Sequence, residues 1–377
     1  MRTNLIAALQ HGKPVLPAMR HEGIGSDTLE AFVNAEAEAR PELKIAPWEA
    51  PDAMDFRIAM FDVRGFRASW KREAIFRRLA QEDPALDAQL TLETLHENGG
   101  ARSVIKLHSY EPLPRDAPLM LLDADADPEI TNRLAEGARF LRIESRPEAE
   151  IVQVSDRTLS NSWLLDSEKG PQRRADLLTI IEREVQNASN QVLLVVTKAV
   201  LTALHRDAGT PIDLSDEAAL LTPLRGATPR WFGPRMQGVN DFEVYSTILI
   251  AGRMQQPIPA LEADARGLFG HDGDPFEESP SGMLPEHPGA YLMRNGSLIH
   301  TRRRSHSDAR ARVLLEQSRE CSTLQAIARL RLVAPKTPKR VVILSSLPLP
   351  GLPISQLTKW KVMVAGLESE ADPNGFQ

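Results

Sequence analysis

The sequence predicts an α/β protein in which helices cover a parallel sheet, preceded by a mainly helical N-terminal region. Two patterns support this prediction. From about residue 150 onward, short apolar runs alternate with helical segments, which is typical of parallel strands buried on both faces. Over roughly the first 100 residues, apolar residues recur instead at the spacing of amphipathic helices.

The N-terminal region is expected to consist mostly of helices joined by loops. Residues 27–38 begin with an acidic turn and place Leu29 and Phe32 on one side, and residues 70–81 show a similar pattern. Proline and alanine are frequent in residues 44–55, which predicts a loop. We therefore expect a helical region that ends near residue 100.

Short runs of apolar and β-branched residues mark the expected strands. The run at 119–123 is apolar up to its terminal aspartate, so we expect it to be a buried strand. Asn295-Gly296 is typical of a two-residue turn and predicts a hairpin over residues 291–300. The other expected strands are residues 104–108, 151–154, 192–197, 246–252 and 341–344.

Helical segments separate several of these strands, as the connections of a parallel sheet require. The expected helices are residues 172–187, 199–205 and, as the longest, about 308–332. Residues 256–290 hold many prolines, glycines and acidic residues, and they predict a long surface insertion.

Composition excludes several classes of protein. Of the 377 residues, 42 % are hydrophobic and 25 % charged, which excludes a disordered chain or a fibrous protein. The net charge of −6 excludes a uniformly basic nucleic-acid coat. The single cysteine, Cys321, cannot build a disulfide framework and fits a reducing compartment. The most apolar run is far shorter than the roughly 18 residues of a spanning helix, so we expect a cytoplasmic protein without a membrane anchor.

Acidic residues follow the expected strand at 119–123. Asp123, Asp125 and Asp127 would lie at the carboxyl end of that strand, where open α/β sheets bind ligands, and carboxylates there could hold Mg²⁺. Equally, Asp125 and Asp127 could cap a helix that begins at Pro128. Taken alone, the pattern could also belong to a metal-dependent nucleotide-sugar transferase.

Two further segments have residues suited to phosphate recognition. Gly238 lets backbone approach a ligand closely, and Asn240 offers a donor and an acceptor, although a tight turn explains both equally well. Gln325 and Arg329 are four residues apart on the expected long helix and share a face. Arg331 lies about 200° further round, so it need not reach the same ligand.

Residues 301–340 carry a local excess of positive charge. Eleven basic residues, including Arg302, Arg303 and Arg304, stand against three acidic ones in an otherwise acidic chain. This asymmetry indicates either a track for a phosphate backbone or an ordinary solvated face.

In chain order, four segments resemble the later half of a superfamily 2 helicase of the kind encoded on phages, plasmids and mobile elements. They resemble, in turn, the close of the first RecA-like domain (122–130), the strand that opens the second (193–198), motif V (238–253) and motif VI (319–331). The resemblance covers about residues 115–365 and implies that a RecA-like parallel sheet covered by helices forms there.

The chain departs from the helicase pattern at several positions. Asp125 replaces a threonine, Ala328 replaces a glycine, and Arg331 follows Arg329 by two positions instead of three. The Gly-x-x-x-x-Gly-Lys-Ser/Thr motif that cradles ATP phosphates is missing from these 377 residues. We therefore expect that the chain begins after the P-loop, and that ATP binding requires a P-loop supplied from elsewhere.

The resemblance also implies a domain organisation. Residues 1–100 correspond to a helical, insertion-like region, and residues 101–150 to a remnant of the first RecA-like domain. Residues 151–365 correspond to the second RecA-like domain with an insertion at 256–306, and residues 366–377 to a flexible tail.

The function implied is that of one part of an ATP-dependent DNA helicase or translocase, with ATP and Mg²⁺ as ligands. The partners implied are single-stranded DNA and a separate or upstream P-loop domain. The alternative is a non-catalytic replication factor, derived from a helicase, that binds DNA or a partner. The resemblance assigns catalytic roles to Arg329, Gln325 and Arg331, nucleotide binding to Gly238, Asn240, Asp123 and Asp125, and nucleic-acid binding to Thr197, Lys198, Arg302, Arg303 and Arg304.

Overall fold

The computed structural model describes most of the chain, in two compact units. The residues outside the description are 1, 11–13, 47, 84–85, 98–99, 115–117, 124, 144–145, 234–240, 273–275, 280–281 and 368–377. Met1–Pro112 and Glu262–Glu277 form the N-terminal unit, and Leu113–Leu261 and Glu278–Gln377 form the sheet unit.

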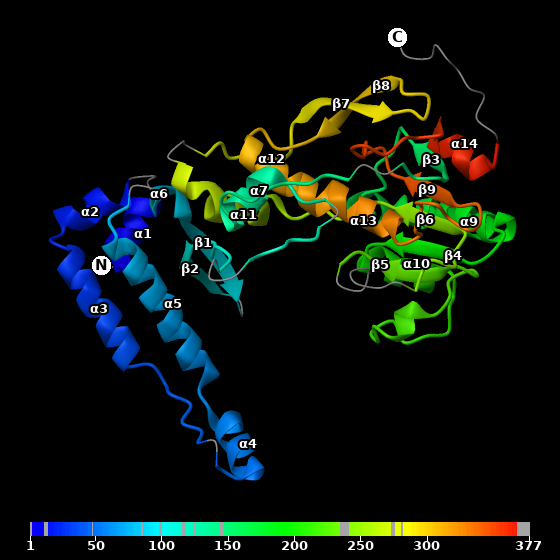
Figure 1. Cartoon of the computed structure of the whole chain (residues 1–377). Helices are drawn as coiled ribbons and strands as arrows, with labels where there is room; N and C mark the ends of the chain where they lie inside the picture. Colours follow the sequence, from blue (N-terminus) through cyan, green and yellow to red (C-terminus); the bar gives the residue numbers. More distant parts are fainter. Residues whose placement is uncertain are drawn as a thin grey trace. The chain divides into compact units, whose positions relative to one another are not determined.

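The N-terminal unit is mostly helical, as the sequence predicts, but it ends in an antiparallel hairpin. Helices α3 and α5 pack side by side (Figure 1), and the rings of Phe32 and Phe76 meet between them at 5.4 Å. A core that includes Leu29 and Leu79 joins them to the shorter helices and to the hairpin. The elements are α1 (Arg2–Gln10), α2 (Val15–His21), α3 (Ser26–Glu38), α4 (Pro51–Met60), α5 (Val63–Ala80), α6 (Leu86–Gln89), β1 (Leu90–Glu97), β2 (Gly100–Leu107), most of α11 (Ile258–Phe269) and the 3-10 turn η3 (Gly270–Asp272).

The sheet unit is built on six parallel strands, which confirms the predicted fold class. Each strand is short and apolar, and β4 and β6 are buried throughout. In spatial order the strands are β10 (Gln356–Thr358), β3 (Glu150–Val154), β9 (Arg340–Leu344), β6 (Thr247–Ala251), β4 (Val192–Val196) and β5 (Thr228–Trp231).

Helices cover both faces of this sheet (Figure 1). Alternate residues of β4 point to opposite sides, so Leu194 packs in one core and Leu193 in the other. The first core includes α8, α9, α10 and α14, and the second includes α13 and one strand of a hairpin, β7. The bounds are α8 (Asn161–Leu164), α9 (Gly170–Asn187), α10 (Lys198–Asp207), α14 (Trp360–Ala365), α13 (Ser322–Ala328), β7 (Glu286–Leu292) and its partner β8 (Leu298–Arg304).

The expected long helix of residues 308–332 forms without a break over residues 309–328 and ends four residues early. It consists of α12 (Ala309–Glu316), a π-helical turn (Gln317–Cys321) and α13. Beyond α13, Arg331 adopts a left-handed backbone with φ of 56°, which is incompatible with a continuing helix. The remaining elements of this unit are α7 (Pro128–Leu134) and the 3-10 turn η1 (Ala219–Leu221).

The strand expected at residues 119–123 does not form. Its side chains are exposed, with Met120 at 80 % and Leu122 at 90 %. Such a run becomes a strand only between two neighbouring strands and under two covering layers, and the six-stranded sheet offers it neither. Asp127, by contrast, caps α7 by accepting from the backbone of Glu129 and Ile130, and Pro128 is its first residue.

Candidate functional site

A cavity of about 830 Å³ opens at the carboxyl edge of the six-stranded sheet. The segments that follow β3, β4, β5, β6 and β9 line it, and the end of β8 closes one side. We call it the edge cavity. It lies where open α/β sheets bind their ligands, because the loops that leave parallel strands converge there.

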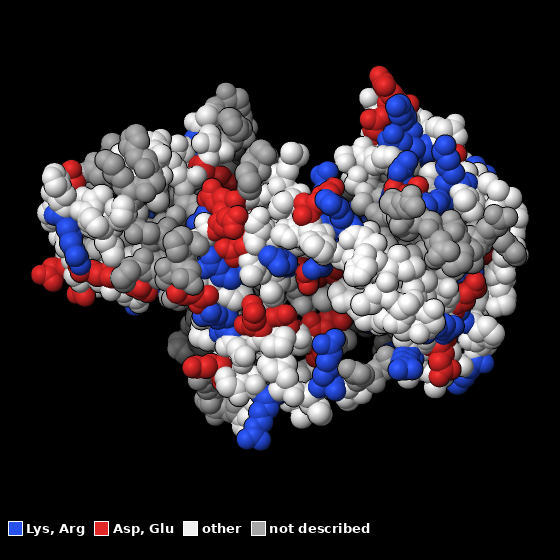
Figure 2. Space-filling view, turned by 90° about the horizontal axis from the view of Figure 1, so that it is seen from above, with Lys and Arg blue, Asp and Glu red and all other residues white. Residues whose placement is uncertain are grey.

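Basic side chains outnumber acidic ones around the edge cavity. Seven arginines and lysines line it against two acids, Asp156 and Glu286. The whole chain carries a net charge of −6, so this concentration of positive charge is local. The face that the space-filling view shows carries both acidic and basic side chains (Figure 2). The basic residues are Arg157, Lys198, Arg253, Arg302, Arg303, Arg304 and Arg319.

Arg253 is the most unusual of these residues. It follows β6 after Gly252 and is partly buried, and its guanidinium bonds only to the amide oxygen of Gln255 among the described residues, at 2.9 and 3.1 Å. Burial, and then repulsion from Arg319, lower the pKa of Arg253 to about 10. Glu320 opposes this shift, but no described carboxylate bonds to Arg253 directly, so this partly buried cation favours an anionic ligand.

The backbone before Arg253 explains how the side chain reaches the cavity. Gly252 has a φ of 80°, and a Cβ there would lie 2.6 Å from the carbonyl oxygen of Leu159. Only glycine tolerates both the left-handed backbone and this close approach. The turn at Gly252 therefore positions Arg253 beneath the segment that follows β3.

Thr197 and Lys198, two predicted nucleic-acid contacts, line the same cavity at the start of α10. Thr197 is the N-cap residue, but its hydroxyl donates to the amide oxygen of Asn161 at 2.6 Å and not to the helix. Lys198 forms an ion pair with Glu217 and lies 6.0 Å from the ring centre of Trp231. The amino end of a ten-residue helix adds a partial positive charge to this wall.

The three predicted arginines of β8 also line the cavity, but they differ in exposure and in their ion pairs. Arg302 is exposed and lies 3.4 Å from Glu286, and Arg303 pairs with Glu316 at 2.6 Å. Arg304 is exposed and makes no ion pair with any described carboxylate. Arg304 is therefore better placed than Arg303 to receive an anion.

A buried ion pair fixes the end of β8 to the π-helical turn. Arg319 is 1 % exposed and donates to both carboxylate oxygens of Glu320, at 2.6 and 2.9 Å. Arg319 also donates to the backbone carbonyl of Arg304 at 2.9 Å, and Glu320 lies 3.5 Å from Arg303. The charge of Arg319 is thus neutralised within the protein, unlike that of Arg253.

Aromatic rings form part of the cavity wall. Trp163, Trp231 and Phe232 line it, and Trp231 and Phe232 are largely buried. Trp163 packs edge-on against Trp360 at 5.5 Å, and the guanidinium of Arg173 lies 4.5 Å from its ring centre. Cations and aromatic rings together are the usual lining of grooves that bind single-stranded nucleic acids.

The predicted nucleotide residues Asp123 and Asp125 lie beside Gln325. The backbone N–H of Asp125 donates to the Asp123 carboxylate at 2.9 Å, and Gln325 forms a hydrogen bond with the Asp125 side chain. Burial and the neighbouring Asp123 raise the pKa of Asp125 above its ordinary value. Burial, and then the carboxylates of Asp125, Glu320, Glu316 and Asp123, raise the pKa of the Cys321 thiol to about 12.

The other predicted catalytic residues are less closely grouped. Arg329 is the C-cap residue of α13, and Arg331 is exposed in the turn beyond it. Neither lines the edge cavity. Gly238 and Asn240 lie outside the described residues.

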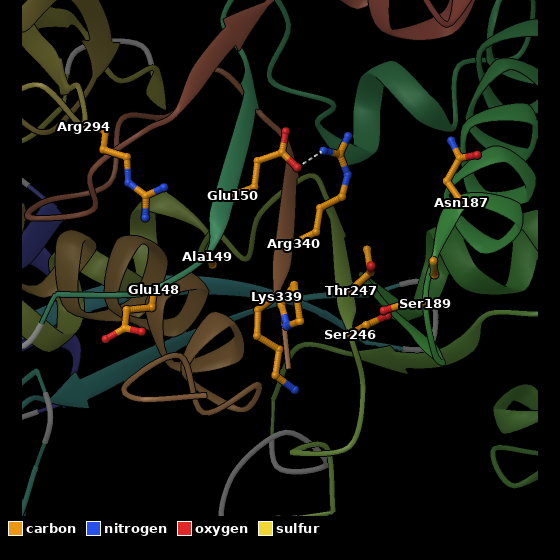
Figure 3. A pocket seen from close by; sticks show the side chains of 12 residues that line it. Glu148, Ala149, Glu150, Asn187, Ser189, Ser246, Thr247, Arg294, Lys339 and Arg340 are labelled. Atoms are coloured by element: carbon orange, nitrogen blue, oxygen red, sulfur yellow. Dashed lines mark hydrogen bonds and ion pairs between the residues drawn. The ribbon is translucent and has the colours of Figure 1, made fainter. Parts of the chain in front are cut away.

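A second cavity, of about 410 Å³, lies at the amino ends of the strands (Figure 3). One of its cations is neutralised within the protein, since Arg340 pairs with Glu150 at 2.6 Å and with Glu184 at 2.9 Å. The Lys339 ammonium donates to two backbone carbonyls. This cavity therefore has less positive charge available for an anionic ligand than the edge cavity has.

Some features of the edge cavity escape sequence reasoning. Arg253 ends the segment that resembles motif V, but the resemblance assigned it no role. No sequence pattern indicates that Arg319 and Trp163 lie at the same sheet edge.

Within the described residues, no group of three potential metal ligands occurs. No helix among them is both long and apolar enough to cross a membrane. Comparison with protein-family models, curated proteins and solved structures found no match.

Proposed function

We propose that this chain binds single-stranded DNA through the edge cavity, as the second RecA-like domain of an ATP-dependent DNA helicase or translocase. The observation that carries the proposal is Arg253, a partly buried arginine at the carboxyl edge of the sheet that bonds to no described carboxylate. A phosphate diester would supply the missing negative charge through charge-assisted hydrogen bonds.

The surroundings of Arg253 favour a polymer of phosphates over a single small anion. Arg304, Arg157 and the amino end of α10 spread positive charge along the cavity, so successive phosphates could each meet a cation. The ring of Trp163 would offer a surface for a base, a contact that tolerates any sequence.

The ATP-dependent part of the proposal rests on the resemblance of motif VI and on one contact. Gln325 bonds to Asp125, so the α13 segment is joined to the acidic segment that the resemblance assigns to the nucleotide site. We propose that Arg329 stabilises charge on the γ-phosphate of ATP when a separate P-loop domain holds the nucleotide and its Mg²⁺.

The test is binding of a fluorescently labelled oligo-dT strand, measured by anisotropy over a range of salt concentrations. Arg253→Ala should weaken binding about 10- to 100-fold, since a hydrogen bond to a charged group contributes roughly 1.5–3 kcal/mol. The slope of log Kd against log salt should fall by about 0.7 if one phosphate contact is lost.

Lys361→Ala is the matched control, because Lys361 is exposed and lies outside the cavity lining. Equal affinity and slope for the Arg253 and Lys361 variants would contradict DNA binding in the edge cavity.

The second candidate is a non-catalytic DNA-binding replication factor, which the missing P-loop motif favours. A non-hydrolysable ATP analogue separates the two candidates. A nucleotide-dependent change in oligo-dT affinity, with or without a P-loop partner, supports the helicase. Affinity that stays constant in both conditions supports the non-catalytic factor.

A further inference from the structure

The solvent face of α5 carries basic residues in a regular row. Arg64, Arg67 and Lys71 are all exposed and are spaced three and four residues apart. At 3.6 residues per turn they fall within about 60° of one another and span about 10 Å along the helix. We call these three residues the α5 row.

The opposite face of α5 is held against α3. Ser69 donates to the backbone carbonyl of Glu36 at 2.6 Å, and Phe76 meets Phe32. Leu79 is fully buried on this side. The α5 row therefore faces away from the packing partner of its own helix.

Partners distinguish the α5 row from the other arginines of this helix. Arg72 pairs with Glu36, Arg77 with Glu73, and Arg78 with Asp83. The three residues of the α5 row make no ion pair with any described carboxylate. Three neighbouring positive charges thus stay uncompensated in a chain of net charge −6.

An exposed tryptophan lies at the border of the row. Trp70 is 56 % exposed and lies about 60° round the helix from Arg67. A large aromatic ring beside free cations provides a stacking surface next to phosphate-binding groups. A merely solvated helix face gains nothing from this exposed ring.

We propose that the solvent face of α5 is a second binding surface for single-stranded nucleic acid, with Arg64, Arg67 and Lys71 on phosphates and Trp70 stacked on a base. The surface belongs to the N-terminal unit and shares only the ligand class with the edge cavity. A membrane surface fits less well, because the apolar side of α5 is already used against α3.

The experiment uses the full chain and the labelled oligo-dT strand over the same salt range. The triple variant R64Q/R67Q/K71Q should lower the salt slope by about 2, since each lost contact to a single strand contributes about 0.7. Trp70→Ala should weaken binding about tenfold or more and leave the slope unchanged, because stacking involves no counterion release.

The matched control is R139Q/R206Q/K361Q, which removes three exposed positive charges from the sheet unit outside the cavity lining. Equal slopes for the two triple variants would overturn the proposal, and so would a wild-type chain that does not bind oligo-dT. The proposal would also be overturned if the α5 triple variant lost binding to phosphatidylserine vesicles but still bound oligo-dT like the wild type. That result would indicate a membrane contact.

The two proposed surfaces can fail separately. If the α5 triple variant binds normally while Arg253→Ala does not, this inference fails and the edge cavity remains. If the reverse holds, DNA binding at the edge cavity fails and the α5 surface remains.

Discussion

At the scale of single residues, the contrast between Arg253 and Arg319 shows how the edge cavity differs from an ordinary core. Both line the edge cavity, with Arg319 fully buried and Arg253 partly buried. Arg319 has Glu320 as its counter-ion, so it needs nothing from outside. Among the described residues Arg253 bonds only to the neutral Gln255, and partial burial is the largest cause of its lowered pKa. An anionic ligand would remove this cost, which ties the residue to binding more than to stability.

Cys321 should be an unreactive thiol in the folded chain. Its pKa is raised to about 12, so at pH 8 the thiolate is a far smaller fraction than in an exposed cysteine. We expect reaction with a thiol-specific disulfide reagent to be at least about a hundredfold slower than in denaturant, and to accelerate about tenfold per pH unit. Because it is the only cysteine, absorbance of the released reagent reports on it alone.

Asp125→Asn provides the internal check on this cysteine. Removing the carboxylate charge should lower the pKa of Cys321 and speed its reaction, whereas Asp166→Asn, an exposed change, should not. Identical rates for the wild type and both variants would mean that residues 123–125 do not lie beside Cys321.

At the scale of elements, the sequence predicts the buried strands better than the edges of the sheet. The strands β4, β6 and β9 are runs of apolar residues flanked by loops, so their pattern is unmistakable. β5 was missed because Pro229 interrupts its pattern. A proline is tolerated there because β5 is an edge strand that pairs only with β4.

The candidate site, too, could be predicted only in part from local sequence patterns. Lys198 and the arginines of β8 could be singled out from charge and order in the sequence, and they do meet at one cavity. Arg319 could not, because its role depends on the π-helical turn, which no residue pattern marks. The prediction of a strand at 119–123 was wrong for the opposite reason. The local pattern of this segment is strong, but no neighbouring strand pairs with it among the described residues.

The Arg319–Glu320 pair should be the main link between β8 and the π-helical turn. Glu320→Gln leaves a buried guanidinium without its counter-ion, and we expect it to lower the free energy of unfolding by about 3–5 kcal/mol. Chemical denaturation monitored by circular dichroism measures this loss.

Glu286→Gln is the comparison for this pair, because it removes the carboxylate of an exposed pair with Arg302 and should cost less than about 1 kcal/mol. Similar costs for Glu286→Gln and Glu320→Gln would show that the buried pair does not stabilise this region.

At the scale of the whole molecule, the chain has groups suited to binding phosphates of DNA but lacks a motif for binding those of ATP. The sheet unit has the edge cavity and Arg329, in the segment that resembles motif VI, but the sequence lacks the motif of a loop that would hold ATP phosphates. The ATP hydrolysis that we propose therefore depends on a P-loop that these 377 residues do not contain.

We expect the purified chain alone to hydrolyse ATP no faster than buffer, with or without single-stranded DNA. A phosphate-release assay measures this, and Arg329→Ala should change nothing in the isolated chain. ATP turnover above background that disappears in the Arg329 variant would contradict the proposal that a separate P-loop domain holds the nucleotide.

The route of the chain between its two units has a practical consequence. Residues 262–277 belong to the N-terminal unit although they are enclosed in sequence by the sheet unit. A Cβ at Gly270 would lie 2.8 Å from the Gln89 side chain, so this returning segment fits closely against the end of the helical region. A single protease cut near residue 112 would leave the first fragment held by non-covalent contacts with the second. The two fragments should therefore co-elute in native gel filtration and separate only under denaturing conditions.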